Sequence, residues 1–259
     1  MTDSSRMPPS PGRGDEGGGR YPRIDPDSLD RGALIGMIDY TLLKPEETAG
    51  EYSRFLEAAA RWGFRTVFIP PCYVPLAVRT LEGTGVTVGT PVSFPFGYAS
   101  PEVKVAEALL SLGDGAREID VVMNISAALS GEWETVEEDL AAVVSSIRGR
   151  EGRTPGETVV IKVILETPYL DDEQKTEACR RAVAAGMDFV KTATGLGPGG
   201  ATAHDIRLMR GVVGDGLGVK ASGGIRTWAD ARAMISAGAS RIGTSAGPKL
   251  VEDFTRATS

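Results

Sequence analysis

Short apolar segments alternate with longer amphipathic segments from residue 29 onward. The apolar segments are typical of buried parallel strands, and the longer segments repeat their apolar positions with the 3.6-residue period of helices packed on a sheet. A predicted helix follows each strand except the last, which is followed by a C-terminal tail. The pattern predicts strands at residues 37–41, 65–70, 86–94, 117–125, 157–166, 188–192, 218–224 and 240–247.

Eight strand-helix units fill residues 29–259, at about 29 residues each, which is close to the size of a (β/α)8 barrel of ~250 residues. The sequence therefore predicts an α/β fold, a (β/α)8 TIM barrel in a single domain over residues 29–259. Residues 1–28 are rich in Gly, Pro, Ser, Arg and Asp and nearly lack apolar side chains. They are predicted to form a disordered N-terminal tail, because they cannot bury enough apolar surface to fold.

Composition narrows the classes of function. The chain is 41% hydrophobic and 24% charged, with a formal net charge of −7. No stretch combines basic with aromatic residues, which argues against a nucleic-acid partner or an anionic membrane surface. No segment is apolar enough for a membrane span or an export signal, so a cytoplasmic protein is expected. Cys72 and Cys179 are far apart and are interpreted as ordinary thiols.

Lysine is scarce and unusually placed. The chain has seven lysines against 21 arginines, and Lys162, Lys191 and Lys220 fall in or at the end of predicted strands, 29 residues apart each time. That spacing is one strand-helix unit, so the three lysines should converge from the fifth, sixth and seventh strands. Lys162 is expected deeper, and Lys191 and Lys220 at the C-terminal mouth, where barrels of this fold carry their chemistry.

Two interpretations of these lysines are open. Taken singly, each lysine is more simply explained as a snorkelling or salt-bridged side chain. Taken together, neighbouring ammonium groups disfavour one another's protonation, so one amine is left neutral near pH 7 and can form an imine with a carbonyl. Asp120 is the best acid or base to accompany such an amine, although it could also be a plain ion-pair partner. Asp39 and Glu166 also end strands, with weaker cases.

Glycines and hydroxyl groups after the later strands indicate an anion site. Gly223, Gly224 and Ser245 follow the last two strands, where barrels commonly bind a substrate phosphate, and Thr194 and Gly195 could extend the same cradle. Each glycine pair alone is better explained by a tight turn, but the coincidence of the pairs after the last two strands favours the anion site. His204 is the only histidine of the chain and is expected to have a structural role on a surface helix, beside an Asp205 that is expected to cap it. No metal site or cofactor is predicted.

Several long stretches of the chain resemble those of a known family. The stretches IDYTLLKPEET, EIDVVMNISAALSGEWE, IKVILET, DFVKTATGLGPGGAT, VKASGGIRT and RIGTSAG are similar, in this order, to those of deoxyribose-phosphate aldolase, a class I aldolase. The resemblance runs from about residue 33 to 247. It implies that Lys191 forms the Schiff base, that Lys220 lowers the pKa of Lys191, and that Asp120 relays protons through a water.

The resemblance further implies a substrate and an assembly. The reaction would be reversible cleavage of 2-deoxyribose 5-phosphate to acetaldehyde and glyceraldehyde 3-phosphate, without a cofactor or metal. Residues expected to bind the substrate or its phosphate are Lys162, Thr194, Gly195, Gly223, Gly224 and Ser245. A homodimer is the expected assembly.

The chain departs from the family pattern near the first strands and at its end. Tyr40 stands where many members have histidine, Phe68 where cysteine is usual, and Pro70 and Ala246 also differ. The last residue of the chain is Ser259, whereas some members end in a tyrosine. Two alternatives are therefore kept: a Schiff-base aldolase for another short-chain sugar or aldehyde, and a non-catalytic barrel that binds a phosphosugar.

Overall fold

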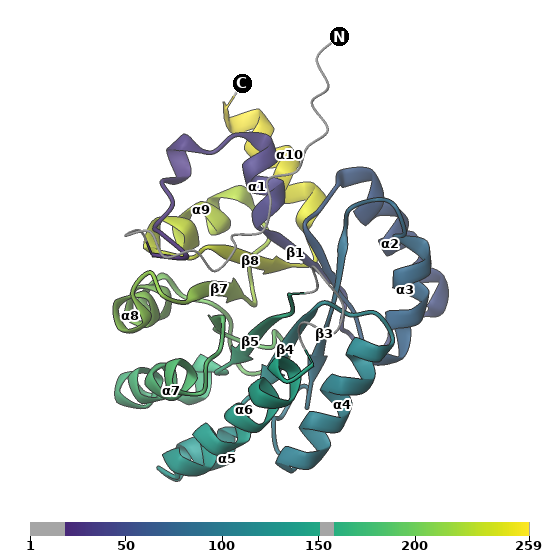
Figure 1. Ribbon diagram of the computed structural model, residues 1–259. Coiled ribbons are helices and arrows are strands. Elements are labelled where there is room, and N and C mark those ends of the chain that lie inside the picture. The colour runs from purple at the N-terminus through teal and green to yellow at the C-terminus, as the bar shows by residue number, and fades with distance from the viewer. Residues whose placement is uncertain (1–18, 151–157, 259) are drawn as a thin grey trace.

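Eight parallel strands close into a barrel in the order in which they occur in the chain (Figure 1), as the sequence predicts. The computed structural model describes residues 19–150 and 158–258. Each strand pairs with the next, and the last pairs with the first. The strands are β1 (Ile38–Thr41), β2 (Thr66–Phe68), β3 (Thr87–Val92), β4 (Glu118–Val122), β5 (Val160–Ile164), β6 (Phe189–Lys191), β7 (Gly218–Ser222) and β8 (Arg241–Thr244).

Helices surround the barrel (Figure 1). Capping boxes fix the start of three of them: the side chains of Thr48, Asp171 and Thr227 each accept the N–H of the third helical residue. The helices are α1 (Arg31–Met37), α2 (Ala49–Trp62), α3 (Val74–Thr80), α4 (Pro101–Gly113), α5 (Ile125–Leu129), α6 (Trp133–Arg148), α7 (Asp172–Ala184), α8 (Ala203–Val213), α9 (Trp228–Ala237) and α10 (Gly247–Thr258), with short 3₁₀ turns η1 (Pro26–Ser28), η2 (Pro71–Tyr73) and η3 (Thr167–Tyr169).

Alternate strand residues face opposite sides of the barrel wall. Ile119 and Val121 of β4, like Ile161 and Val163 of β5, belong to the apolar core that packs against the helices. The intervening positions point into the barrel, because successive side chains of a strand point to opposite faces. Those inward positions carry most of the charged residues of the strands, so the charges are collected on the axis of the barrel.

The N-terminal segment differs from its prediction. Residues 1–18 of the predicted tail lie outside the described residues, but residues 19–28 are placed against the barrel. The ring of Tyr21 meets Phe189 edge-on at 4.6 Å between centroids, and Arg20 forms an ion pair of 2.8 Å with Asp188. This end of the barrel, at the N-terminal ends of the strands, is called the floor. The prediction of disorder is wrong for this stretch, because contacts with residues far along the chain order it.

The observed helices also differ from the predicted elements in three places. Two helices, α1 and α5, were not distinguished from the neighbouring strands, and the predicted C-terminal tail is the helix α10. Figure 1 shows α10 beside α1, against which it packs. Residue 157, the first of the predicted fifth strand, lies outside the described residues. Within the described ranges, no helix combines the length and the apolar character that crossing a bilayer requires.

Candidate active site

Seven charged side chains point into the barrel, and together we call them the interior charge cluster. Each is at most 5% exposed, so the cluster is almost completely removed from water. The predicted convergence of the three lysines is confirmed, since all three ammonium groups contact one carboxylate. The cluster consists of Asp39 from β1, Glu118 and Asp120 from β4, Lys162 from β5, Lys191 from β6, Lys220 from β7 and Arg241 from β8.

Asp120 is the centre of the upper part of this cluster. Its Oδ2 atom accepts hydrogen bonds from Lys191 and Lys220, both at 2.8 Å, and its Oδ1 atom accepts one from Lys162 at 3.0 Å. The strand register explains this meeting, because Asp120 lies opposite Lys162 and Lys191 lies opposite Lys220. One carboxylate is therefore shared by three amines.

Asp39 and Glu118 form the lower part of the cluster. Arg241 donates to both carboxylates, at 3.1 Å to Glu118, and so links β8 to β1 and β4. The second oxygen of each carboxylate faces a lysine: Glu118 Oε2 accepts from Lys162 at 2.5 Å, and Asp39 Oδ2 lies 2.6 Å from Lys220. Asp39, a weaker candidate in the sequence, thus lies beside the lysines.

The sequence reasoning missed Glu118 and Arg241. Glu118 stands two residues before Asp120 and so faces the same side of β4, which is a signal that strand periodicity offers. The sequence also placed Lys162 among the substrate-binding residues. Its side chain is fully buried between Glu118 and Asp120, and a role in substrate binding stays a prediction.

Electrostatics separate Lys191 from the other members of the cluster. Burial, reinforced by Lys220 and Lys162, outweighs the attraction of Asp120 and lowers the pKa of Lys191 to about 8. For Lys162 the balance is reversed: burial lowers its pKa, but Asp120 and Glu118 outweigh this and raise it above the ordinary value. Burial alone would raise the pKa of Asp120, yet the three lysines hold it well below its usual range. Lys191 is therefore an amine that loses its proton readily beside an ionised carboxylate.

Phe68 lies against the lysines and was noticed in the sequence only as a departure from the family pattern. The Nζ atom of Lys220 stands 3.7 Å from the centre of its ring, and that of Lys191 stands 5.7 Å away. The ring covers this side of the cluster and makes a cation–π contact with the ammonium group of Lys220. Tyr40, the other aromatic departure, belongs to the outer core and stacks on Phe55.

A cavity of about 280 Å³ opens at the C-terminal mouth of the barrel. Among the described residues that line it, Lys191 is the one member of the interior charge cluster, so it is the amine of the cluster that a ligand can reach. The end of β1 and the loop after it, residues 41–44, also contribute to the lining. The cavity also contains the predicted anion-binding residues Thr194, Gly195, Gly223, Gly224 and Ser245.

Backbone geometry explains the glycines of this cavity. Gly223 has a φ of 91°, which side chains other than glycine rarely adopt, and a Cβ atom at this position would come within 2.9 Å of Gly200. The carbonyl of Gly223 accepts the N–H of Ala201 at 3.0 Å, which ties the loops after β6 and β7 together. Glycine is thus required where two loop backbones meet beside Lys191.

Several backbone N–H groups of this lining, among them those of Gly195, Gly224 and Ser245, donate to no acceptor among the described residues. The N–H of Thr194, in contrast, is bound by the buried carboxylate of Glu166 at 2.9 Å. Glu166 therefore braces the loop after β6 and lies outside the interior charge cluster. The cradle available to an anion is narrower than the sequence predicted.

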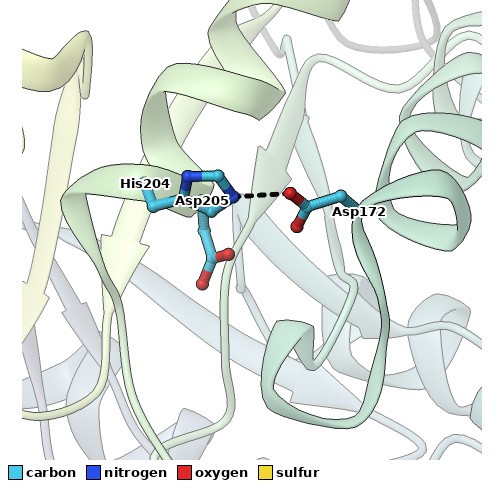
Figure 2. Close-up of side chains that lie close together, drawn as sticks. All are labelled: Asp172, His204 and Asp205. Carbon is cyan, nitrogen blue, oxygen red and sulfur yellow. Dashed lines mark hydrogen bonds and ion pairs between the residues drawn. The ribbon is translucent and has the colours of Figure 1, made fainter.

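One group of side chains in the described residues has the ligand types of a metal site (Figure 2). It consists of Asp172 at the start of α7 and His204 and Asp205 at the start of α8. His204 Nε2 lies 2.7 Å from Asp172, and the ammonium group of Lys175 lies 2.8 Å from Asp205 and 3.2 Å from Asp172. Because Lys175 already forms ion pairs with both carboxylates, the group is an ion-pair network between two helices. Thr202, and not Asp205, caps α8.

Comparisons with known proteins agree with this geometry. A profile of the DeoC/LacD family aldolases matches residues 38–251, which include all eight strands and every member of the interior charge cluster. The chain belongs to this aldolase family. The aldolase is 51% identical, over 86% of its length and 94% of the relative's, to a deoxyribose-phosphate aldolase of Caldanaerobacter subterraneus. A deoxyribose-phosphate aldolase of Bacillus subtilis is 45% identical over 85% of this chain and 95% of its own.

A solved structure supports the same relationship for the fold of the aldolase. The deoxyribose phosphate aldolase of Aeropyrum pernix, which is described as tetrameric, superposes with a TM-score of 0.78 and is 34% identical. The match covers 87% of this chain and 92% of that chain.

Proposed function

We propose that the aldolase cleaves 2-deoxy-D-ribose 5-phosphate reversibly to acetaldehyde and D-glyceraldehyde 3-phosphate through an imine on Lys191. The observation that carries the proposal is the position of Lys191: it is an amine with a pKa of about 8, it lines the mouth cavity, and it contacts Asp120. The names of the relatives supply the substrate. Imine formation needs a neutral amine within reach of the carbonyl, and Lys191 meets both conditions.

The reaction follows from these roles. The Lys191 amine adds to the C1 carbonyl, and loss of water gives a protonated imine. The C3 hydroxyl then gives up its proton, the C2–C3 bond breaks, and its electron pair moves into an enamine that is held on Lys191. Protonation of C2 and hydrolysis of the imine release acetaldehyde. Asp120 and Lys220, which lie 2.8 Å apart, are the groups placed to carry these protons, with water between them and the substrate.

The phosphate would bind to backbone N–H groups that line the mouth cavity. The N–H groups of Gly195, Gly224 and Ser245 are available there, and α10 begins two residues after Ser245. Exposed N–H groups and a helix N-terminus both favour an anion. If this assignment holds, Ser245→Pro, which removes one of these donors, should raise the KM for the phosphorylated sugar about tenfold, by roughly 1.4 kcal/mol, and change kcat little. An unchanged KM would place the phosphate elsewhere.

Trapping the imine tests the proposed function. The protein would be incubated with acetaldehyde and reduced with borohydride, and the ethylated residue would be located by mass spectrometry. We expect the ethyl group on Lys191 and none at that peptide in Lys191→Ala. Lys44→Ala is the matched control, because Lys44 also lines the mouth cavity but is exposed, and its loss should leave the adduct unchanged.

The outcomes separate the alternatives. A barrel that only binds phosphosugars would give no adduct above the Lys191→Ala level, and this result would refute the proposed function. An adduct on Lys191 without cleavage of 2-deoxyribose 5-phosphate would establish a Schiff-base aldolase for another short-chain sugar or aldehyde. The homodimer and the cytoplasmic location stay predictions.

A further inference from the structure

The interior charge cluster contains more potential cations than carboxylates. Among the described residues, its ion pairs join four basic side chains to three carboxylates. All seven groups are buried. A buried net charge is costly, so the cluster is neutral only when one of its basic groups has lost its proton.

Of the four basic groups, Arg241 is the one that keeps its proton, so the proton is lost from one of the three lysine amines. A guanidinium group remains protonated in proteins, whereas a buried lysine readily becomes neutral. Arg241 also binds one oxygen of Asp39 and one of Glu118. Each of these carboxylates then has one oxygen left for a lysine.

The remaining oxygens are distributed unequally among the three lysines. Lys162 contacts Glu118 at 2.5 Å as well as Asp120, and Lys220 contacts Asp39 at 2.6 Å as well as Asp120. Lys191 has Asp120 alone among the described residues, and it shares the Oδ2 atom with Lys220. Lys191 is therefore the least compensated amine of the cluster.

We propose that Arg241 is a positioning residue for the aldol reaction, which acts from the floor of the barrel through Asp39 and Glu118 and leaves Lys191 as the uncharged amine. The proposal rests on the proposed function of Lys191. Arg241 lines a cavity at the floor with Tyr21 and Phe189 and not the mouth cavity, so it does not reach the substrate. Its influence passes through the shared carboxylates.

Other charged groups face Lys191 from the loops at the mouth. Glu166 is committed to the N–H of Thr194. Lys44, Glu47 and Arg226 line the same cavity, where they are wholly or partly exposed to water. Water screens those charges, whereas Lys191 contacts the carboxylate of Asp120 directly, at 2.8 Å, within the buried cluster.

Three substitutions test the charge count with different signs. Arg241→Met leaves three lysines facing three carboxylates, so Lys191 should keep its proton to higher pH. Arg241→Lys keeps the positive charge and should restore most of the wild-type behaviour. Glu118→Gln increases the excess of cations and should let Lys191 lose its proton at lower pH. Arg65→Met is a graded control, because Arg65 also lines the floor cavity and helps to lower the pKa of Glu118 through space, but forms no ion pair with the cluster among the described residues.

The measurement is the rate at which acetaldehyde and cyanoborohydride ethylate Lys191, followed from pH 6 to pH 10. The ethylation rate of each variant is divided by the wild-type rate at the same pH, so that the pH dependence of the reductant cancels. The shift of the midpoint relative to wild type is obtained from this ratio. We expect the midpoint of Arg241→Met to rise by at least one pH unit, equivalent to about a tenfold slower reaction at pH 7. The midpoint of Glu118→Gln should fall, that of Arg241→Lys should stay near wild type, and that of Arg65→Met should rise by less than that of Arg241→Met. Circular dichroism establishes that each variant is folded.

The result can contradict the proposal without touching the proposed function. If wild type forms no adduct on Lys191, the proposed function itself is refuted. If wild type reacts and the profile of Arg241→Met is unchanged, the role of Arg241 is refuted alone. An Arg241→Lys profile that matches Arg241→Met would also contradict it, because the charge was kept. Should Arg241→Met not fold, Glu118→Gln decides, and a midpoint that fails to move downward overturns the proposal.

Discussion

Buried charges occur in two regions of this barrel that differ in how the charges are balanced. Between α4 and α6, the ammonium group of Lys104 meets Asp139 at 2.5 Å and the carbonyl of Val122 at 3.0 Å, one cation to one carboxylate. Burial lowers the pKa of Lys104 and raises the pKa of Asp139, in each case against the pull of the partner. In the interior charge cluster, four basic groups share three carboxylates. The balanced pair holds two helices together, and the unbalanced cluster releases a proton from Lys191.

The largest expected effect is on turnover. Lys191→Met removes the amine that forms the imine and should lower kcat/KM for 2-deoxyribose 5-phosphate by at least about a thousandfold. Lys104→Met is the matched change in the balanced pair, and the folded fraction of that variant should keep its activity. A coupled assay of the aldehyde product measures both. Equal losses in the two variants would remove the functional distinction between the regions.

The next largest effect is on the stability of the protein, when the balanced pair of Lys104 and Asp139 is broken. Lys104→Met leaves the carboxylate of Asp139 buried without its cation, which should lower the free energy of unfolding by about 3–5 kcal/mol. Urea denaturation followed by circular dichroism measures the loss. A change below about 1 kcal/mol would show that the pair contributes little.

Replacing Lys191 of the cluster by methionine should change the free energy of unfolding in the opposite direction. The folded protein holds the pKa of Lys191 at about 8, below the value of about 10.4 in an unfolded chain. The unfolded state therefore binds the proton more tightly, and the resulting penalty is complete below pH 8 and disappears as the pH rises toward 10. Lys191→Met should stabilise the fold by about 1–3 kcal/mol at pH 7 and by little at pH 10. Urea denaturation at the two pH values would contradict this if the variant were less stable at pH 7.

The smallest effect is expected when the balanced pair is replaced as a whole. Lys104→Met combined with Asp139→Leu removes both charges and fills the space with apolar atoms, so its stability should return to within about 1 kcal/mol of wild type. The double-mutant cycle also measures the coupling between the two residues. If the double variant is as unstable as Lys104→Met, loss of packing rather than an unpaired charge explains the single substitution.

The sequence was sufficient for the repeat and for part of the site. The alternation of apolar segments predicted eight units, and the equal spacing of Lys162, Lys191 and Lys220 predicted that they meet. These features are local or periodic, and a barrel converts a constant spacing into neighbouring positions. Leu250, Val251 and Phe254 have the spacing of one helix face and could have indicated α10, but nothing along the chain indicates that this face packs against α1.

The pairing of Arg241 could not be read from the sequence. Its partners, Asp39 and Glu118, are 202 and 123 residues away. The position of Tyr21 under Phe189 is of the same kind, since those residues lie far apart in the chain. Local patterns contain no information on which distant residues pair in an interior, and so the link from Arg241 to Asp39 and Glu118 was not predicted.

The segment at the floor has a consequence for how this enzyme can be shortened. Hydropathy places the start of the domain at residue 29, and a version cut there would lose Arg20 and Tyr21 and open the space beneath Arg241. Water entering from below would raise the local dielectric constant and weaken the interaction of Arg241 with its two carboxylates. Such a cut would therefore change the acidity of Lys191 at the opposite end of the barrel, although the removed residues do not contact this amine.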